Sequence, residues 1–287
     1  MRILLTFLIA LSFISCNSKD DKIVVGSKNF SEQVLLGEIV SQQIEKKTKL
    51  KVDRKLNLGG SFICHKALIA GEMDTYVEYT GTALTAILKH EPQTDRAAVF
   101  KIVRDDYDKQ FGAEWLDALG FNNTFALLVR KEDADRYKLK TISDLAHYTS
   151  KMTPGFGYEF MQRKDGFPGL AKVYGLSFPV HPKTMDLMIS YTALAQKKVD
   201  LISGNSTDGL IQQLNLVVLE DDRHFFPPYE AAPVVRKDTL ARHPELGVAL
   251  RELGGKISEE KMRQLNAEVD VKKRDVKQVA AEFLKTL

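Results

Sequence analysis

The chain alternates short runs of β-branched and aromatic residues with amphipathic stretches of helical period, and this alternation is the feature that most restricts its fold. Strand-like runs occupy residues 23–26, 52–58 and 75–79, and apolar residues at helical spacing lie in 29–44 and 62–70. Strands that alternate with helices in this way form α/β layers around a mostly parallel sheet. We therefore expect an α/β protein, and its 287 residues are enough for two lobes.

Helix starts and ends can also be predicted. Glu32 follows Asn29 by three residues, which is the spacing of a capping pair whose side chains satisfy N–H groups of the first helical turn. Gly60 and Ser61 predict a turn and a cap before the second helix, and Gly71 predicts the end of that helix.

The start of the chain predicts a secretory signal over residues 1–15. A basic start precedes an apolar run over residues 3–14, which is too short to span a bilayer as a structural helix. Residues 13–16, FISC, resemble the lipobox of bacterial lipoproteins. We expect lipidation of Cys16 and a flexible tether over residues 16–21. An ordinary secretory signal with an incidental cysteine is the alternative.

Charge and cysteine content exclude several classes. Without Arg2, 40 basic residues face 38 acidic ones, and the basic residues are dispersed rather than gathered in a stripe, so we expect no nucleic-acid partner. With Cys16 assigned to lipid, Cys64 is the other cysteine, which excludes a disulfide framework. No histidine has a partner at metal-ligand spacing, so we expect neither a metal nor a cofactor.

An internal similarity suggests two lobes of like construction. Residues 67–84, ALIAGEMDTYVEYTGTAL, align without a gap to residues 193–210, ALAQKKVDLISGNSTDGL. Each copy runs from a helix end through an aspartate and a short strand to a turn with a hydroxyl and a glycine. Ligands of open α/β sheets bind beyond the carboxyl ends of strands. Both turns lie at such ends, so we expect both to line one cleft.

Six segments together resemble the substrate-binding proteins of bacterial ABC importers for glycine betaine, choline and carnitine. They occur in family order and cover nearly all of the chain after the signal: GSKNFSEQ (26–33), EYTGTAL (78–84), NNTFAL (122–127), GFGYEFMQRKDGFPGL (155–170), STDG (206–209) and VVLEDDRHFFPPYEAAPVVRK (217–237). The resemblance implies a type II periplasmic-binding-protein fold, in which two hinge strands join two α/β lobes around a ligand cleft. It places lobe 1 in residues 22–127 plus 231–287 and lobe 2 in 128–230, with hinges near 126–130 and 231–235.

The resemblance also implies the site residues. A trimethylammonium group donates no hydrogen bond and is best held by aromatic faces, each worth roughly 0.5 to 2 kcal/mol. The family's aromatic cage and the polar position beside it correspond to Tyr79, Phe125, Tyr229 and Asn123. Donors for a ligand carboxylate correspond to Lys28, Thr82 and Arg163.

One position departs from the family pattern. The residue before STDG is usually aromatic in the betaine binders, and here it is Asn205. The change removes one wall of the cage and adds a side-chain amide. Either the protein binds betaine weakly, or its ligand carries a polar group at this place, as ergothioneine does.

The resemblance therefore implies an extracytoplasmic, lipid-anchored receptor that captures a small zwitterionic or cationic ligand and delivers it to a permease and an ATPase. We expect a monomer, attached to the membrane through its lipid only. No GxSxG, P-loop, HExxH or CxxC motif supports an enzyme. The alternatives are a ligand-sensing receptor and an enzyme built on the same two-lobed scaffold.

Overall fold

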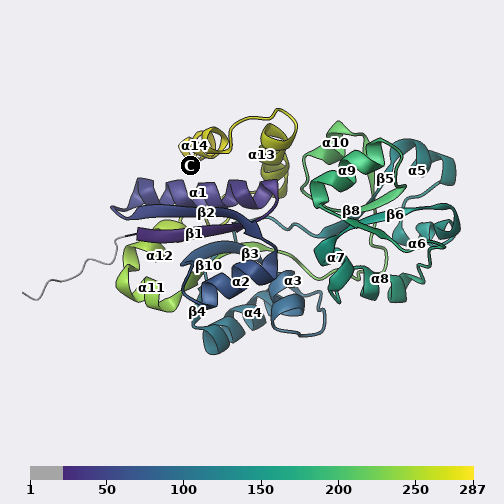
Figure 1. Cartoon of the computed structure of the whole chain (residues 1–287). Coiled ribbons are helices and arrows are strands. Elements are labelled where there is room, and N and C mark those ends of the chain that lie inside the picture. Colours follow the sequence, from purple (N-terminus) through teal and green to yellow (C-terminus); the bar gives the residue numbers. More distant parts are fainter. Residues whose placement is uncertain (1–21) are drawn as a thin grey trace, which may run out of the picture.

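The computed structural model describes residues 22–287. The predicted signal, tether and lipidated Cys16 lie outside these residues. The first of two sheets has the strand order β2-β1-β3-β10-β4 (Figure 1). Its strands are β1 (Lys22–Lys28), β2 (Lys51–Gly59), β3 (Thr75–Tyr79), β4 (Ala113–Trp115) and β10 (Ala231–Arg236). Strand β1 runs parallel to β2 and β3, and β10 runs antiparallel to β3 and β4.

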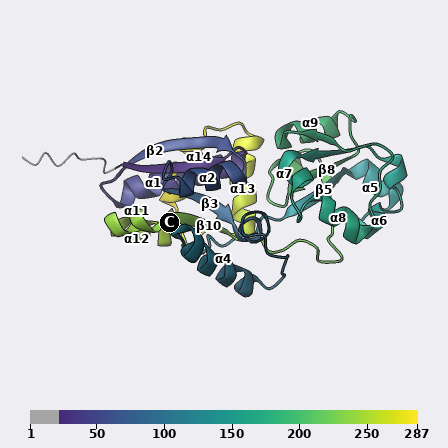
Figure 2. The ribbon, with the colours of Figure 1, turned by 60° about the horizontal axis from the view of Figure 1, so that its bottom comes forward.

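Helices cover both faces of this sheet. Their bounds are α1 (Ser31–Lys47), α2 (Ser61–Ile69), α3 (Thr80–Thr82), a π-helical turn (Ala83–Ile87), α4 (Arg96–Phe111), α11 (Lys237–Arg242), α12 (Pro244–Arg251), α13 (Glu259–Asp270) and α14 (Val276–Lys285). The last two come from the end of the chain. Helix α14 packs along α1, and both views place α13 between the body of this lobe and the second lobe (Figures 1 and 2).

The second sheet has the order β7-β6-β8-β5-β9. Its strands are β5 (Phe125–Arg130), β6 (Pro154–Gly157), β7 (Lys183–Met185), β8 (Leu201–Asn205) and β9 (Leu216–Leu219). Its helices are α5 (Lys131–Tyr137), α6 (Ile142–Leu145), a 3-10 turn (Thr149–Lys151), α7 (Tyr158–Gln162), α8 (Phe167–Tyr174), α9 (Leu187–Ala195) and α10 (Leu210–Gln213). The two sheets, each with its helices, form the expected α/β lobes.

Two segments cross between the lobes. Residues 116–124 connect β4 to β5, residues 220–230 connect β9 to β10, and the two segments meet in a bridge between Asn122 and Glu230. All of β5 pairs with β8 and β9 in the second sheet. The first crossover therefore precedes β5, whereas the sequence-based boundary after residue 127 divides that strand. The apolar run of β5 carries no residue that marks where the chain changes lobes.

The internal similarity corresponds to equivalent hydrogen bonds at the start of β3 and β8. Asp74 Oδ2 accepts the N–H of Val24 at 2.8 Å, and Asp200 Oδ2 accepts the N–H of Thr153 at 3.0 Å. In each lobe the aspartate thus ties its own strand to the start of the neighbouring parallel strand. The aspartate that the two copies share therefore has the same structural role in each lobe.

The turns after the two strands hold the two crossovers in the same way. Thr80 Oγ1 accepts the N–H of Glu230 at 3.0 Å, and Ser206 Oγ accepts the N–H of Thr124 at 3.2 Å. The backbone N–H groups of Thr80 and Ser206 donate in return to the carbonyls of the same two crossover residues. Each turn therefore fixes the segment that leads into or out of the other lobe.

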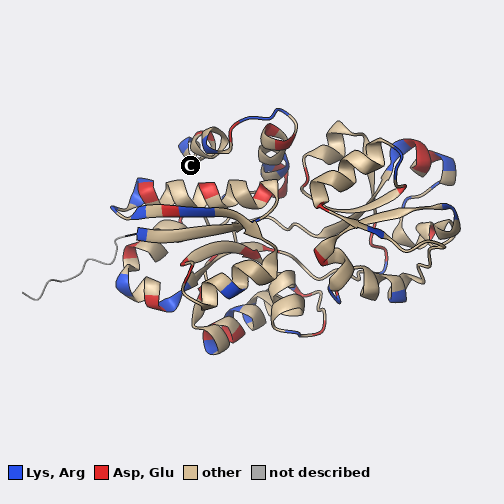
Figure 3. Cartoon of the chain, in the orientation of Figure 1, with Lys and Arg blue, Asp and Glu red and all other residues tan. Residues whose placement is uncertain are grey.

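Within residues 22–287, no helix is long and apolar enough to cross a membrane. Figure 3 shows that positively and negatively charged residues are interspersed along the ribbon of both lobes.

Candidate functional site

A cavity of about 290 Å³ lies between the two lobes. Its walls come from the ends of β1, β3 and β8, from both crossovers and from α7. The cavity is large enough for a small molecule. All eight side chains predicted to bind a ligand line it: Lys28, Tyr79, Thr82, Asn123, Phe125, Arg163, Asn205 and Tyr229.

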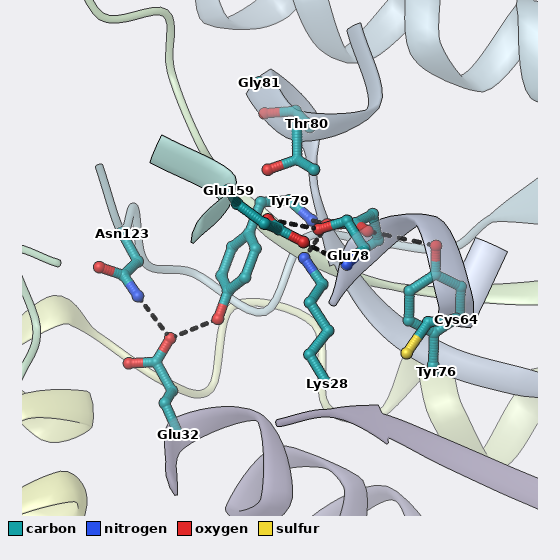
Figure 4. Close-up of polar contacts among 12 residues, drawn as sticks. Lys28, Glu32, Cys64, Tyr76, Glu78, Tyr79, Thr80, Gly81, Asn123 and Glu159 are labelled. Atoms are coloured by element: carbon teal, nitrogen blue, oxygen red, sulfur yellow. Dashed lines mark hydrogen bonds and ion pairs between the residues drawn. The ribbon is translucent and has the colours of Figure 1, made fainter. Parts of the chain in front are cut away.

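Tyr79 is the last residue of β3, and strand alternation sets where its ring goes. Successive side chains of a strand point to opposite faces, so Tyr79 shares with Val77 the face that packs against α1. Its hydroxyl donates to Glu32 Oε1 at 2.6 Å (Figure 4), and its ring stacks on Phe30 with centroids 6.5 Å apart. The ring is held at both ends while it lines the cavity.

Phe125 and Tyr229 form a second aromatic corner. Their ring centroids are 5.7 Å apart at 70°, and the centroid of the Phe160 ring lies 5.1 Å from that of Phe125. The Tyr229 hydroxyl donates to Asp165 Oδ2 at 2.6 Å. A side chain at Gly81 would place its Cβ 2.7 Å from the Tyr229 ring. Glycine in the turn after β3 therefore leaves the space that this ring occupies.

Lys28 ends β1 and carries its charge into the cavity wall. Its Nζ forms a buried ion pair with Glu78 and lies 4.6 Å from the centroid of the Tyr79 ring (Figure 4). Glu78 also accepts the backbone N–H of Tyr79 at 2.6 Å and the hydroxyl of Tyr76 at 3.2 Å. Lys28 is therefore already paired, and a ligand carboxylate would share it with Glu78.

Arg163 connects the second lobe to the first. It is buried, and its Nε and Nη2 donate to Asp165 at 2.9 and 2.5 Å. Its Nη1 lies 3.1 Å from Thr82 Oγ1 in the first lobe and 3.3 Å from Glu159 Oε2. The guanidinium also lies 4.9 Å from the centroid of the Phe125 ring. This network fixes the arginine against an aromatic wall.

Two carboxylates beside these cations, Asp165 and Glu159, have lowered pKa values. Burial raises the pKa of Asp165 and of Glu159, but nearby positive charge outweighs it and holds both pKa values below their usual range. Arg163 acts on both groups, and Lys28 acts on Glu159. With Glu78, three carboxylates face these two cations. This part of the wall therefore carries no excess of positive charge.

Glu159 also joins the lobes by capping a helix. Its Oε1 accepts the N–H of Ser61, the first residue of α2, at 2.5 Å, and its Oε2 accepts the Ser61 hydroxyl at 3.1 Å. Gly60 precedes the helix and provides no side-chain cap of its own. A Cβ at Gly60 would lie 2.3 Å from Glu159 Oε1, so glycine permits this approach. The negative charge sits where a helix N-terminus favours it.

Glu32 is the main feature that sequence reasoning missed. Its two carboxylate oxygens accept hydrogen bonds from four side chains, at 2.6 Å from Tyr79, 2.8 Å from Asn123, 2.5 Å from Thr207 and 2.7 Å from Asn266. These donors lie on β3, on the first crossover, in the second lobe and on α13. One buried carboxylate thus holds a cavity ring and connects both lobes.

The predicted capping pair of Asn29 and Glu32 is wrong. Helix α1 begins at Ser31, and Phe30 precedes it without a side-chain cap. Burial raises the pKa of Glu32, although its four hydrogen bonds favour the ionised form. The spacing of a capping pair was present, but the tertiary donors that occupy Glu32 come from distant parts of the chain.

The two asparagines of the cavity have different surroundings. Asn123 has both ends of its amide occupied, since Nδ2 donates to Glu32 at 2.8 Å and Oδ1 accepts the N–H of Thr207 at 3.4 Å. Asn205 ends β8 in register with Phe125, and its Nδ2 lies 3.3 Å from Asp208 Oδ1. Burial raises the pKa of Asp208 to about 7.

Further lining residues carried no individual signal in the sequence. Tyr158 lines the cavity and is largely exposed. Within residues 22–287, no cluster of three possible metal ligands is found. The remaining large apolar side chains of the wall are Phe30, Phe62, Ile63, Phe160 and Leu187.

Comparison with known proteins connects this geometry to a family. Residues 21–286 match the OpuAC model, described as the substrate binding domain of an ABC-type glycine betaine transport system. The chain is 40% identical over 281 residues to the ergothioneine transport permease/ergothioneine binding protein EgtU of Helicobacter pylori, covering 97% of this chain and 50% of that protein. It thus spans half the length of that relative.

Other relatives are similar over most of their length. The carnitine transport binding protein OpuCC of Listeria monocytogenes is 37% identical, over 93% of this chain and 87% of that protein. The chemotactic signal transduction system substrate-binding protein CosB of Halobacterium salinarum is 28% identical, over 75% of this chain and 70% of that protein.

Solved structures agree in fold. A glycine betaine/carnitine/choline ABC transporter structure superposes with a TM-score of 0.74 at 38% identity, covering 92% of this chain and 98% of that one. A choline binding protein in complex with choline shares the fold with a TM-score of 0.67 at 11% identity. The type II binding-protein fold is confirmed. The chain therefore belongs to the non-enzymatic family of substrate-binding domains of ABC-type glycine betaine transport systems.

Proposed function

We propose that this protein is a receptor for a small molecule with a methylated ammonium group, which it captures between its lobes and delivers to an ABC permease. One observation carries the proposal. Tyr79, Phe125 and Tyr229, from three distant segments, line the same cavity. A quaternary nitrogen has no N–H group to donate to a hydrogen-bond acceptor. Aromatic faces attract its positive charge instead, and desolvation of the site strengthens this attraction.

The charges of the wall suit such a ligand. Three carboxylates, Glu78, Glu159 and Asp165, lie against two cations, Lys28 and Arg163. This arrangement tolerates a positive ligand group. A ligand carboxylate, where present, would take up unused N–H groups of the two cations and the hydroxyl of Thr82.

Glycine betaine, choline and carnitine are the first candidates, and a different betaine such as ergothioneine is the second. Asn205 favours the second, because it puts an amide where the betaine binders usually have a ring. The 40% identical relative is named for ergothioneine, and the 37% identical relative is named for carnitine.

The proposed setting is the outer side of the cell membrane, in the periplasm or on the outer face. FISC at residues 13–16 supports an anchor through lipidated Cys16, with residues 1–15 removed as a signal. The proposed partners are a permease and an ATPase that consumes ATP, and the receptor itself is a monomer without cofactor. A sensing role is the second candidate, favoured by the similarity to CosB, which is named as a substrate-binding protein of a chemotactic signal transduction system.

A ligand screen tests the proposal. Thermal unfolding of residues 22–287 would be followed with glycine betaine, choline, carnitine and ergothioneine, and with glycine as a control that lacks the methyl groups. A ligand that binds only the native state raises the melting temperature, and at a hundred times its Kd the stabilisation is about 2.7 kcal/mol. We expect at least one methylated compound to do so and glycine to have no effect. A screen in which none stabilises the protein would contradict the proposal.

A further inference from the structure

The side-chain amide of Asn205 is oriented by a neighbouring carboxylate. Its Nδ2 lies 3.3 and 3.5 Å from the two carboxylate oxygens of Asp208. An ionised carboxylate can only accept hydrogen bonds, so the NH₂ end of the amide must face it. The carbonyl oxygen, Oδ1, is then the atom on the side away from Asp208, and Asn205 lines the cavity.

Asp208 is itself fixed by two further donors. The hydroxyl of Tyr191 donates to its Oδ2 at 2.5 Å, and the backbone N–H of Asn205 donates to the same oxygen at 2.9 Å. Gly204 leaves room for this contact, since a Cβ there would lie 2.4 Å from the Tyr191 hydroxyl. Tyr191, Asp208 and Asn205 thus form a chain that starts in the buried core of the second lobe and ends at the cavity wall.

Three other polar side chains of the wall, those of Tyr79, Tyr229 and Asn123, already have hydrogen-bond partners. The hydroxyls of Tyr79 and Tyr229 donate to buried carboxylates, and Oδ1 of Asn123 accepts the N–H of Thr207. Among residues 22–287, the hydrogen bonds of the Asn205 amide go from Nδ2 to Asp208, and none is made to its Oδ1. The amide carbonyl of Asn205 is therefore available to accept a hydrogen bond from a ligand.

We propose that Asn205 determines specificity by offering a fixed hydrogen-bond acceptor, so that the protein selects methylated ammonium compounds that also carry an N–H or O–H donor. The inference rests on the proposed function and narrows it. A trimethylammonium group has no donor, so the donor comes from a ring N–H, from a hydroxyl, or from an ammonium in which hydrogen replaces one methyl. A ligand without a donor leaves the desolvated carbonyl unpaired, which is costly.

Four ligands separate these sources in calorimetric titrations. Glycine betaine has no donor, dimethylglycine has an ammonium N–H, choline has a hydroxyl, and ergothioneine has a ring N–H. The titrations would be made at pH 8, above the pKa of about 7 of Asp208, so that its carboxylate is ionised and orients the amide. Wild type is compared with Asn205→Leu, which keeps the size of the side chain and removes the acceptor.

We expect Asn205→Leu to weaken the best donor-bearing ligand by about tenfold, and to leave glycine betaine unchanged or bound more tightly. Asp208→Asn keeps Asn205 but replaces the acceptor-only partner with an amide, which can both donate and accept. The Asn205 amide can then turn, so the preference for the donor-bearing ligand should fall in this variant as well.

Equal changes for all four ligands, or none, would overturn the inference while leaving the proposed function intact. Tightest binding of glycine betaine to the wild type would also overturn it. Failure of every methylated compound to bind wild type would contradict the proposed function, and the inference with it. Thermal unfolding of each variant establishes that it is folded. Tyr191→Phe removes one donor to Asp208 and leaves Asn205 in place. We expect this variant to lose less of the preference for donor-bearing ligands than Asp208→Asn does.

Discussion

Tyr79 makes two separable contributions, and two substitutions distinguish them. Tyr79→Phe removes only the hydroxyl that donates to Glu32 at 2.6 Å and leaves the ring in place. Glu32 then keeps three of its four donors. A hydrogen bond to a charged group is worth about 1.5–3 kcal/mol. We expect a loss of unfolding free energy of that order, with ligand affinity changed by less than about threefold, a difference under about 1 kcal/mol.

Tyr79→Ala removes the ring as well. Replacing a buried aromatic residue by alanine costs about 3–5 kcal/mol of stability. Loss of one desolvated aromatic contact with a cation, about 1.4 kcal/mol, should weaken binding about tenfold. Urea unfolding measures the first quantity, and calorimetric titration with the compound that gave the largest thermal shift measures the second.

The comparison has a control and a clear contradiction. Tyr137 is a half-buried tyrosine at the end of α5, where it packs on Tyr148 with ring centroids 5.0 Å apart, and it does not line the cavity. Tyr137→Ala should destabilise the second lobe without changing affinity. If Tyr79→Phe weakened binding as much as Tyr79→Ala did, the hydroxyl rather than the ring would hold the ligand, and the reasoning would be refuted.

Three further substitutions test other parts of the structure. Glu159→Ala removes the cap on Ser61, so closure of the two lobes over a ligand becomes less favourable. We expect about tenfold weaker ligand binding and a larger radius of gyration by small-angle scattering. No change in either quantity would contradict the role of this contact. Asn205→Tyr should raise the affinity for glycine betaine up to about tenfold by supplying a fourth ring, and calorimetry showing no gain in a folded variant would speak against a missing wall. Asp208→Asn tests the pKa of about 7, which burial causes. Native Asp208 keeps its proton up to that pH, whereas the unfolded chain loses it near pH 4, so wild type should lose about 1.4 kcal/mol of stability per pH unit relative to the variant between these values. If the unfolding free energies of wild type and variant, measured with urea, changed with pH in the same way, a raised pKa of Asp208 would be excluded.

The alternation of strands and helices was sufficient to predict the architecture. Strand β3 has the predicted bounds, Thr75–Tyr79, because a β-branched and aromatic run ends at a turn with glycine. The repeat of Asp74 at Asp200 predicted two lobes of like construction, and both aspartates make the same hydrogen bond. These features depend on local pattern, which the sequence displays directly.

The residues that line the site could be predicted, but the hydrogen bonds that hold them could not. Resemblance placed Tyr79 and Arg163 at the cavity, but the buried partners of these side chains, Glu32 and Asp165, were not recognised. Glu32 has the spacing of a cap, and Asp165 stands in a run of charged residues that is also typical of a solvated loop. Which carboxylate is buried depends on donors that come from distant segments, and local spacing contains no information on them.

The central claim is that aromatic side chains hold a positively charged, methylated nitrogen, and a pair of isosteres tests it most directly. Glycine betaine and 3,3-dimethylbutanoate have the same shape and the same carboxylate, but the second has a neutral carbon in place of the nitrogen. Calorimetry on residues 22–287 should give at least about tenfold weaker binding for the carbon compound, since the attraction between a cation and a ring is lost. Equal affinities for the two compounds would contradict the account.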